Sequence, residues 1–244
     1  MKVMIIGATS AIAHEVSRCF AADNAALFLV ARSAEKLAAA ADDLRVLGAS
    51  QVETYCADLA DLSTHAALID AGKTALGGMD AVLIAHGVLG DQQAAQQNVE
   101  TTLELFNVNA ISYISLLTLL ANHFEVQKQG SIAVIGSVAG DRGRGSNYIY
   151  GAAKGAVALF AGGVRNRLAK VGVSVVTVKP GFVDTPMTAG MKKNLLFAKP
   201  AQVGKRIYTA MLKGEDIVYT PPFWMLIMFI IRNIPERIFK KLKL

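Results

Sequence analysis

The chain begins Met1-Lys-Val-Met-Ile-Ile-Gly7-Ala-Thr-Ser-Ala-Ile-Ala13, and this stretch sets the pattern for most of the sequence. Its apolar run reaches Gly7 too soon for a secretory signal, so we interpret it as a buried strand near 2–6. A glycine-containing turn and a segment of helical period near 10–22 follow it. Short apolar runs and longer helical segments continue to alternate, which is typical of a parallel sheet covered by helices on both faces.

Most of the apolar runs are continuous, as in Ala26-Leu-Phe-Leu-Val30, because strands covered on both sides bury every side chain. We therefore predict an α/β fold with one doubly wound, seven-stranded parallel sheet. A single domain is expected at residues 1–220, with an apolar and basic tail at 221–244. The expected strands lie near 2–6, 26–31, 51–56, 80–85, 131–136, 173–179 and 216–219, and the helices near 10–22, 33–47, 61–76, 98–125, 147–170 and 199–213.

The composition excludes several classes of protein. Hydrophobic residues make up 53% and charged residues 18% of the 244 residues, and no Pro-, Ser- or Gln-rich stretch indicates disorder. Cys19 and Cys56 have neither a CxxC spacing nor a histidine cluster nearby, so we expect a reducing cytoplasm and no metal site. Much of the net charge of +6 lies in the tail, and no basic stripe carries interleaved aromatics, so nucleic acid is not an expected partner.

Tyr150-Gly-Ala-Ala-Lys154 places a phenol and an ammonium group one helical turn apart, where both can point into one cleft. A phenol has a pKa of about 10, so it acts as an acid–base catalyst at neutral pH only when a nearby cation stabilises the phenolate. Ser137 closes the strand that precedes this helix, and Asn109 lies in Phe106-Asn-Val-Asn-Ala110. Together these residues predict proton-transfer chemistry.

Further candidate residues directly follow the predicted strands. Ligands of an open parallel sheet bind beyond the carboxyl ends of its strands, so residues at this edge are expected to share a site. In strand order they are Gly7, Arg32, Asp58, Gly87, Ser137, and Pro180 with Gly181.

With these residues in place, the chain resembles the short-chain dehydrogenase/reductase family over about residues 1–220. The resemblance implies a Rossmann-type fold, a nicotinamide cofactor and a catalytic set of Asn109, Ser137, Tyr150 and Lys154. In that set, Tyr150 would give a proton to the substrate oxygen, while Lys154 would lower the pKa of Tyr150 and bind the nicotinamide ribose. Ser137 would hold the carbonyl oxygen, and Asn109 would anchor a water. The implied cofactor contacts are Gly7, Thr9, Ser10, Ala11, Ile12, Arg32, Ser33, Asp58, Leu59, Ala85, His86, Gly87, Tyr150, Lys154, Pro180, Gly181, Val183 and Thr185, of which Thr185 would face the nicotinamide amide.

Simpler alternatives exist for the individual residues. Ser137 could only cap a turn, Asn109 could be a satisfied polar residue at a helix kink, and Tyr150 could be half-buried packing. Their joint order and their strand context favour catalysis over these alternatives.

Two segments depart from the family pattern. Gly7-Ala-Thr-Ser-Ala-Ile-Ala13 stands where the family has Gly-x-x-x-Gly-x-Gly, so Ala11 and Ala13 replace two glycines. Alanine is the smallest intrusion and the helix N-terminus still attracts phosphate, so we expect a working, slightly displaced dinucleotide site; the alternative is a loop that no longer binds cofactor. Ala85-His-Gly87 replaces Asn-Ala-Gly, and we expect His86 to be structural rather than a proton donor.

Arg32 determines the expected choice of cofactor. An acidic residue at the end of the second strand would favour NAD, whereas the Arg32 guanidinium can bind the extra phosphate of NADP and stack on adenine. NADP(H) is therefore the expected cofactor. Alternatively, Arg32 is a solvated surface charge.

The tail contains the run Pro221-Pro-Phe-Trp-Met-Leu-Ile-Met-Phe-Ile-Ile231, followed by a basic segment. Its nine consecutive apolar residues cannot cross a bilayer as a helix, which needs about twenty. We expect the run to lie in the interface of an anionic leaflet; the alternative is a buried helix or a dimer contact with a solvated basic end. Pro235 is expected to divide the tail into two short helices.

The segment near 187–199, which includes Met187 to Phe197, is expected to be an apolar substrate lid. The tail, the sequence Leu83-Ile-Ala-His-Gly87 and the near-bare amino terminus resemble reductases that act on a decaprenylphosphoryl-linked 2-keto pentose. The expected function is NADPH-dependent reduction of a ketone, on a lipid-linked keto sugar, in the cytoplasm or on the inner face of the cytoplasmic membrane.

Two alternatives to this function stay open. One is reduction of a 3-oxoacyl chain on a carrier protein or coenzyme A, where the basic surface would meet an acidic carrier. The other is a non-catalytic, NADP-sensing scaffold. The family resemblance also implies a homodimer or homotetramer formed through the helices near 98–125 and 147–170.

Overall fold

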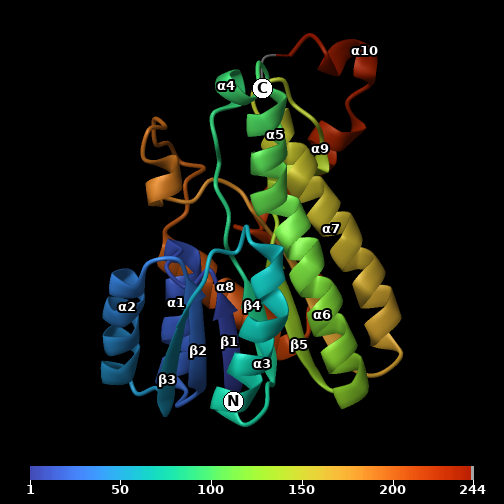
Figure 1. The fold of residues 1–244 in the computed structure, drawn as a ribbon. Coiled ribbons are helices and arrows are strands. Elements are labelled where there is room, and N and C mark those ends of the chain that lie inside the picture. Colours follow the sequence, from blue (N-terminus) through green and yellow to red (C-terminus); the bar gives the residue numbers. More distant parts are fainter. Residues whose placement is uncertain (243–244) are drawn as a thin grey trace.

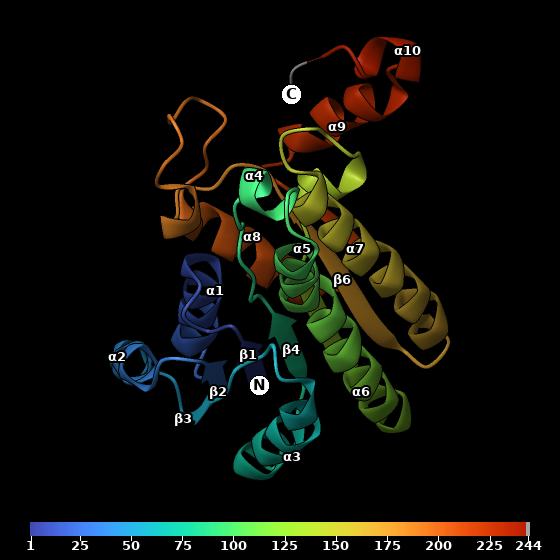
Figure 2. The ribbon, with the colours of Figure 1, turned by 45° about the horizontal axis from the view of Figure 1, so that its top comes forward.

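The structure is a computed structural model that describes residues 1–242 of the chain. In this part of the chain, seven parallel strands form one sheet in the order β3-β2-β1-β4-β5-β6-β7, with helices on both faces (Figures 1 and 2). The predicted strand bounds differ from these by at most one residue. The strands are β1 (Lys2–Ile6), β2 (Ala26–Ala31), β3 (Gln51–Cys56), β4 (Ala81–Ile84), β5 (Gly130–Ile135), β6 (Val173–Pro180) and β7 (Ile217–Thr220).

The helices connect consecutive strands, and two more follow the last strand. They are α1 (Ala11–Ala22), α2 (Ala34–Val46), α3 (His65–Leu76), α4 (Gln92–Ala95), α5 (Val99–Phe106), α6 (Ser112–Gln127), α7 (Tyr148–Ala169), α8 (Pro200–Lys213), α9 (Phe223–Asn233) and α10 (Glu236–Phe239). Short 3₁₀ turns lie at Leu62–Thr64, Val138–Asp141 and Pro186–Thr188. The helix predicted near 61–76 covers the first turn together with α3, whereas α4 and the other two turns were not predicted, because they are too short to show a helical period.

Alternate residues of each strand contribute to two cores. Val3 and Ile5 pack in the layer formed with α1, α2 and α8, whereas Met4 and Ile6 pack in the layer formed with α3, α6 and α7. Because both faces are covered, most strands are largely apolar, as the sequence predicted, whereas the edge strand β3 is largely exposed. The winding of the sheet reverses between β1 and β4, and this is where a crevice opens at the carboxyl edge.

The single helix predicted near 98–125 is instead two helices, α5 and α6, joined by a π-helical turn at Asn107–Ile111. The Asn109 amide donates hydrogen bonds to the Leu105 carbonyl at 3.0 Å and the Val88 carbonyl at 2.9 Å. Its oxygen accepts one from the Val88 N–H at 3.0 Å. These bonds join the helix to the segment after β4 and stabilise the break, as is common for π turns near functional sites.

One helical stretch, Val99–Gln127, has the length and the mean hydropathy, 1.5, of a membrane span. It consists of α5, the π turn and α6. One side of α6, which includes Leu116 and Leu120, is buried in the core that the sheet and α7 share, whereas Val99, Leu103 and Val126 are exposed. We therefore interpret this stretch as a core helix.

The tail forms two helices that meet at Pro235, as predicted. One face of α9 packs on the protein: Trp224 and Met228 are buried in a small cluster with Val138 and partly buried Phe182. The opposite face of α9 is exposed. The buried-helix alternative for the tail is therefore correct for one side of α9 only.

α8 and α1 make close contact at a glycine. A Cβ atom on Gly204 would lie 2.5 Å from the Glu15 Cβ and 2.9 Å from the Glu15 carbonyl carbon. Any side chain at position 204 would therefore push α8 away from α1, the helix that begins at the crevice.

We expect Gly204→Ala to lower the free energy of unfolding by about 1–3 kcal/mol, because the added methyl group overpacks this contact. Gly163→Ala in α7 is the matched control: its Cβ would meet nothing within 4 Å, and it should raise the free energy of unfolding by about 0.5–1 kcal/mol. Urea unfolding followed by circular dichroism measures both. A Gly204→Ala protein as stable as the parent would show that α8 is free to shift.

Candidate active site

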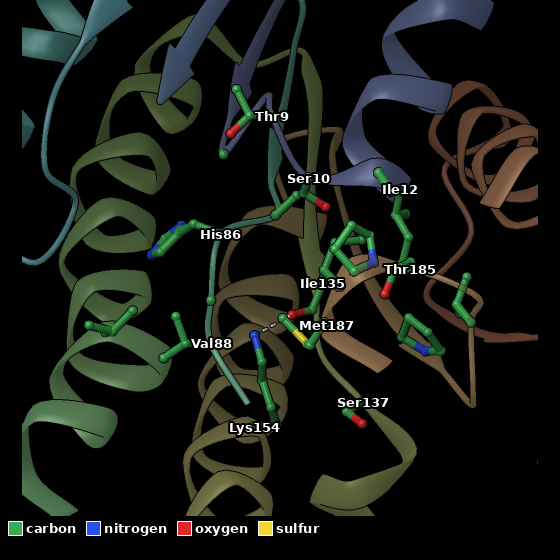
Figure 3. Close-up of a pocket in the computed structure, with 18 of the residues that line it drawn as sticks. Thr9, Ser10, Ile12, His86, Val88, Ile135, Ser137, Lys154, Thr185 and Met187 are labelled. Atoms are coloured by element: carbon green, nitrogen blue, oxygen red, sulfur yellow. Dashed lines mark hydrogen bonds between the residues drawn. The ribbon is translucent and has the colours of Figure 1, made fainter. Parts of the chain in front are cut away.

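The carboxyl edge of the sheet opens into one cavity, with the segment after β6 on one side (Figure 3). Most residues predicted to form the site line it. These are Gly7, Thr9, Ser10, Ala11, Ile12, Arg32, Asp58, Leu59, Ala85, His86, Gly87, Ser137, Tyr150, Lys154, Pro180, Gly181, Val183 and Thr185, together with Met187 of the expected lid. The structure does not place Ser33 and Asn109 in this lining.

The sequence analysis missed several lining residues. Most of them are direct neighbours of predicted ones, so their place at strand ends is the signal that could have found them. Val108 gave no such signal, because it lies within the unexpected π turn. The missed residues are Ala31, Ala60, Val88, Val108, Ile135, Gly136 and Pro186, whereas Thr188 belongs to the predicted lid.

The turn after β1 requires glycine at its first position. Gly7 has φ +86°, which is unfavourable for other residues, and its N–H donates to the Val30 carbonyl at 2.8 Å. A Cβ atom here would lie 2.5 Å from the His86 nitrogen. The turn after β1 and the segment after β4 thus touch backbone to backbone at the floor of the cavity.

The two alanines that replace family glycines fit without distorting the start of α1. Ala13 is fully buried in the core, and Ala11 is the first residue of α1 and lines the cavity. Ser10 occupies the N-cap position, but its side chain makes no cap hydrogen bond. The hydroxyl of Ser10 and the first N–H groups of α1 are therefore available for an anion at this helix end.

Arg32 and Asp58 follow β2 and β3 at the rim of the cavity. Arg32 is exposed, and its guanidinium forms no ion pair among the described residues. Asp58 accepts a hydrogen bond from the Ala60 N–H at 3.1 Å. The prediction for Ser33 is not supported, because its hydroxyl turns away to cap α2 and accepts from the Lys36 N–H at 3.3 Å.

Glycines bring the Ser137 turn against the first turns of α7. A Cβ atom on Gly140 would lie 2.6 Å from the Gly155 nitrogen, and one on Gly151 would lie 2.8 Å from the Ala139 carbonyl oxygen. Because the turn at Val138–Asp141 and the helix can pack this closely, Ser137 reaches Tyr150. Ser137 also accepts from the Ala139 N–H at 3.1 Å, so it caps this turn as well, as its alternative interpretation stated.

Lys154 is almost fully buried, and its ammonium group has two hydrogen-bond acceptors. It donates to the Ile135 carbonyl at 2.9 Å, which Figure 3 shows, and to the Tyr113 hydroxyl at 3.3 Å. Its nitrogen lies 5.9 Å from the centre of the Tyr150 ring. The ammonium group is thus beside the phenol but held by other groups.

The electrostatics of this pair differ from the expectation that Lys154 lowers the pKa of Tyr150. Removal from water raises the pKa of Tyr150 to about 12, and the hydrogen bond with Ser137 opposes this only in part. Burial also lowers the pKa of Lys154 to about 7. Desolvation disfavours both charged forms and is the largest cause of each shift, so the expectation that Lys154 lowers the pKa of Tyr150 is wrong for this structure.

Asn109 has no amide N–H left for a water. Both of its donors are used by the Val88 and Leu105 carbonyls, and the side chain is completely buried outside the cavity lining. These contacts fit the alternative interpretation, a satisfied polar residue at a helix break. They give no support to a water-anchoring role for the Asn109 side chain.

His86 is structural, as expected, and it packs on a residue that the sequence did not single out. Its Nε2 lies 2.5 Å from the Ser112 hydroxyl, and its ring stacks on Tyr113 with centroids 4.3 Å apart. Burial, with the nearby Lys154, lowers the pKa of His86 well below its usual value, so the ring is neutral. Tyr113 donates to the His86 carbonyl and accepts from Lys154, and thus connects the family departure at His86 to the buried amine.

Thr185 begins the segment that closes one side of the cavity. Its N–H donates to the Thr188 hydroxyl at 3.2 Å, which forms the start of a short 3₁₀ turn. The base of the segment is fixed, because Val183 pairs with Ala198 and Phe182 stacks on Phe197 at 5.2 Å. Of the predicted lid, its first two residues, Met187 and Thr188, line the cavity.

Comparisons with known proteins identify the class of protein. Residues 1–195 match the family model described as short chain dehydrogenase. This chain belongs to the short-chain dehydrogenase family, and it is an oxidoreductase with a Rossmann-type fold.

Three similar proteins illustrate the range of relatives. An uncharacterized oxidoreductase of Mycobacterium tuberculosis is 35% identical over 98% of this chain and 96% of its own length. A 3-oxoacyl-[acyl-carrier-protein] reductase of Bos taurus is 28% identical over 79% of each chain. A crystal structure of an actinorhodin polyketide ketoreductase with NADPH has the same fold, with a TM-score of 0.80 and 21% identity over 89% of this chain and 95% of that one.

Burial of Lys154 predicts a stability that rises with pH. Its pKa is about 7 in the folded protein and close to the usual value of 10.5 when unfolded. Between these values the unfolded chain holds the proton and the folded chain does not, so stability increases as pH rises through this window. Below pH of about 7 the folded protein carries the whole penalty of the buried charge.

We expect Lys154→Met to stabilise the protein by about 1–2 kcal/mol near neutral pH, because an apolar side chain removes this penalty. The gain should shrink by about pH 10, where the amine of the parent protein is neutral in the folded state. Lys170→Met, at the exposed end of the same helix, is the control and should show no such pH dependence. Urea unfolding at both pH values tests this, and a variant less stable than the parent at both would contradict it.

Proposed function

We propose that this oxidoreductase reduces a ketone to a secondary alcohol, with NADPH as the hydride donor and Tyr150 as the proton donor. The proposal rests on one observation: Ser137, Tyr150 and Lys154 lie together at the carboxyl edge of the sheet, within a single cavity. The relatives described as ketoreductases support a carbonyl group as the reacting group.

The described residues fit a dinucleotide with an extra phosphate. The open turn at Gly7 and the free N–H groups of α1 would hold the pyrophosphate. β2 ends without an acidic residue, and the unpaired guanidinium of Arg32 would bind the 2′-phosphate. When bound, this cofactor supplies a hydride, and the residues of the chain handle the proton and the charge.

Tyr150 suits the role of an acid in the direction of reduction. With a pKa of about 12, its phenol keeps its proton at neutral pH and can give it to an oxygen that becomes an alkoxide. Ser137 lines the same cavity and opposes part of the rise in the pKa of Tyr150, so its hydroxyl would donate to the same substrate oxygen. The Lys154 amine is near its midpoint at neutral pH, and its protonated form would stabilise the phenolate that remains.

For the substrate we propose a bulky, lipid-linked keto sugar. The lid exposes the large apolar side chains of Met187, Met191 and Leu195. Such side chains would contact a hydrophobic substrate group better than a small polar one. Reduction of a 3-oxoacyl chain on a carrier protein or coenzyme A is the second candidate, and the Bos taurus relative favours it. The shared cavity of Ser137, Tyr150 and Lys154 favours an enzyme over a sensing scaffold without activity.

We further propose that the protein works in the cytoplasm as a homodimer or homotetramer, in peripheral contact with the inner face of the cytoplasmic membrane through residues 221–244. Exposed apolar residues on the long helices, such as Leu103 of α5 and Leu159 of α7, suit a contact between copies. The exposed face of α9 suits the membrane.

We expect Tyr150→Phe to lower kcat by about 10²-fold or more, because the proton donor is lost while the ring is kept. NADPH affinity and the melting temperature should change little. Tyr148→Phe is the matched control, because Tyr148 is exposed in the same helical turn, and this variant should leave turnover unchanged.

Turnover is measured from NADPH absorbance with a lipid-linked keto sugar and, separately, with a 3-oxoacyl thioester. The comparison also distinguishes the two substrate classes. Full turnover by Tyr150→Phe would remove Tyr150 from its role.

We expect Arg32→Asp to raise the KM for NADPH by about 10-fold or more, because the charge-assisted contact with the 2′-phosphate is lost. The KM for NADH should fall. Lys36→Asp makes the same change of charge on the exposed side of α2 and serves as the control for general electrostatics. Steady-state kinetics with both cofactors measures the effect, and an unchanged NADPH preference would show that Arg32 is a solvated surface charge.

A further inference from the structure

α9 has two chemically different sides. Trp224 and Met228, one turn apart, are buried against the protein. On the other side, Met225, Leu226, Phe229 and Ile230 are 62%, 62%, 65% and 56% exposed. Their spacing places them in one stripe along the helix, which we call the α9 stripe. A contiguous group of large apolar side chains in solvent marks an interaction surface.

The stripe is held in a fixed position by Arg142, the residue after the Ser137 turn. Its guanidinium donates to the Ile231 and Ile234 carbonyls at 2.6 and 2.7 Å, and so ties down the end of α9. It also pairs with Glu236 at 2.8 Å and lies 3.7 Å from the centre of the Phe239 ring. α9 and α10 are therefore a docked part of the protein, and the stripe stays on the outside of it.

Basic side chains lie on α10, directly after it, and on the lid. Arg237, Lys240 and Lys241 are exposed, and the acidic residue among them, Glu236, is already paired with Arg142. The lid adds Lys192 and exposed apolar residues. Figure 1 shows α9, α10 and the lid segment (orange) at the same end of the molecule, beyond the carboxyl ends of the strands.

We propose that the α9 stripe, the basic residues of α10 and the tip of the lid form one docking face for an anionic lipid surface. Apolar side chains would enter the interface while lysines and arginines meet lipid phosphates. α9 has 11 residues, so it would lie in the plane of the surface rather than cross it.

A second copy of the chain fits this face less well than lipid does. A two-fold contact places the same patch on both sides, so the lysines of one copy would face those of the other. Like charges brought together in this way oppose association. An anionic leaflet offers the opposite charge to the same residues, and charge complementarity therefore favours lipid.

Docking in this orientation turns the mouth of the cavity toward the bilayer. A substrate with a lipid tail would then reach Tyr150 without leaving the membrane surface. The inference extends the membrane contact proposed above, but lipid binding and ketone reduction are measured separately, so either can fail alone.

The test is flotation of the full-length protein with phosphatidylcholine vesicles that contain or lack phosphatidylglycerol. We expect binding to the anionic vesicles, at least about tenfold weaker binding to the neutral ones, and release at high salt. Leu226→Glu with Phe229→Glu should abolish binding, and Lys240→Glu with Lys241→Glu should remove the preference for the anionic lipid.

Val46→Glu is the matched control, because Val46 is 89% exposed at the end of α2, away from the docking face, and its change should leave binding intact. All variants should keep their melting temperature and their turnover of a water-soluble ketone. The proposal is overturned if the parent protein binds neither vesicle or if the stripe variant binds like the parent. It is equally overturned if the stripe variant only splits a dimer into monomers, which would assign the face to a second copy.

Discussion

The buried amine of Lys154 is the constraint on which the site depends. An ammonium group in the interior needs acceptors close by, and here these are the Ile135 carbonyl and the Tyr113 hydroxyl. Ile135 ends β5 two residues before Ser137, so the strand that holds the amine also delivers the serine. Tyr113 in turn holds the His86 carbonyl after β4. The carboxyl ends of the neighbouring strands β4 and β5 and the helices α6 and α7 are thus fixed around one titratable group. A buried amine such as that of Lys154 lowers the free energy of unfolding, and proteins retain such groups where function requires the charge.

The turn that carries Ser137 is fixed on three sides. Gly140 packs against α7, and Asp141 forms a buried ion pair with Lys179 at 2.5 Å and accepts from the Tyr219 hydroxyl at 2.6 Å. Arg142 donates hydrogen bonds to backbone carbonyls at the end of α9, in the tail. A buried carboxylate such as Asp141 is tolerable only with partners of this kind. As a result, helix α7, strands β6 and β7 and the tail all contact the turn that positions the Ser137 hydroxyl.

Most strands were predictable because strands covered on both sides leave short continuous apolar runs that alternate with segments of helical period. The π turn at Asn107–Ile111 could not be predicted. It depends on the Asn109 amide, which contacts the backbone of Val88, 21 residues away in the sequence, and such a contact produces no periodic pattern of apolar residues. The spacing of Tyr150 and Lys154 correctly placed both side chains in one cavity. Their pKa values could not be predicted, because desolvation depends on how α6 and β5 pack around them.

Ser33 was predicted as a cofactor contact from its place beside Arg32, whereas its hydroxyl accepts a hydrogen bond from the first turn of α2 instead. Tyr113 lies in a run of apolar helix residues and resembles ordinary core.

The contact between α9 and the cavity wall has an optical consequence. Trp224 fills the space where Gly181, a residue of the cavity lining, would carry a Cβ atom; that atom would lie 1.9 Å from the indole nitrogen. The chain contains a single tryptophan, so all of its indole fluorescence arises from this one place. A reduced nicotinamide absorbs where an indole emits. Quenching of the Trp224 emission would therefore report a reduced nicotinamide in the cavity. The wavelength of the emission would report whether α9 is packed on the protein, and neither measurement needs an added label.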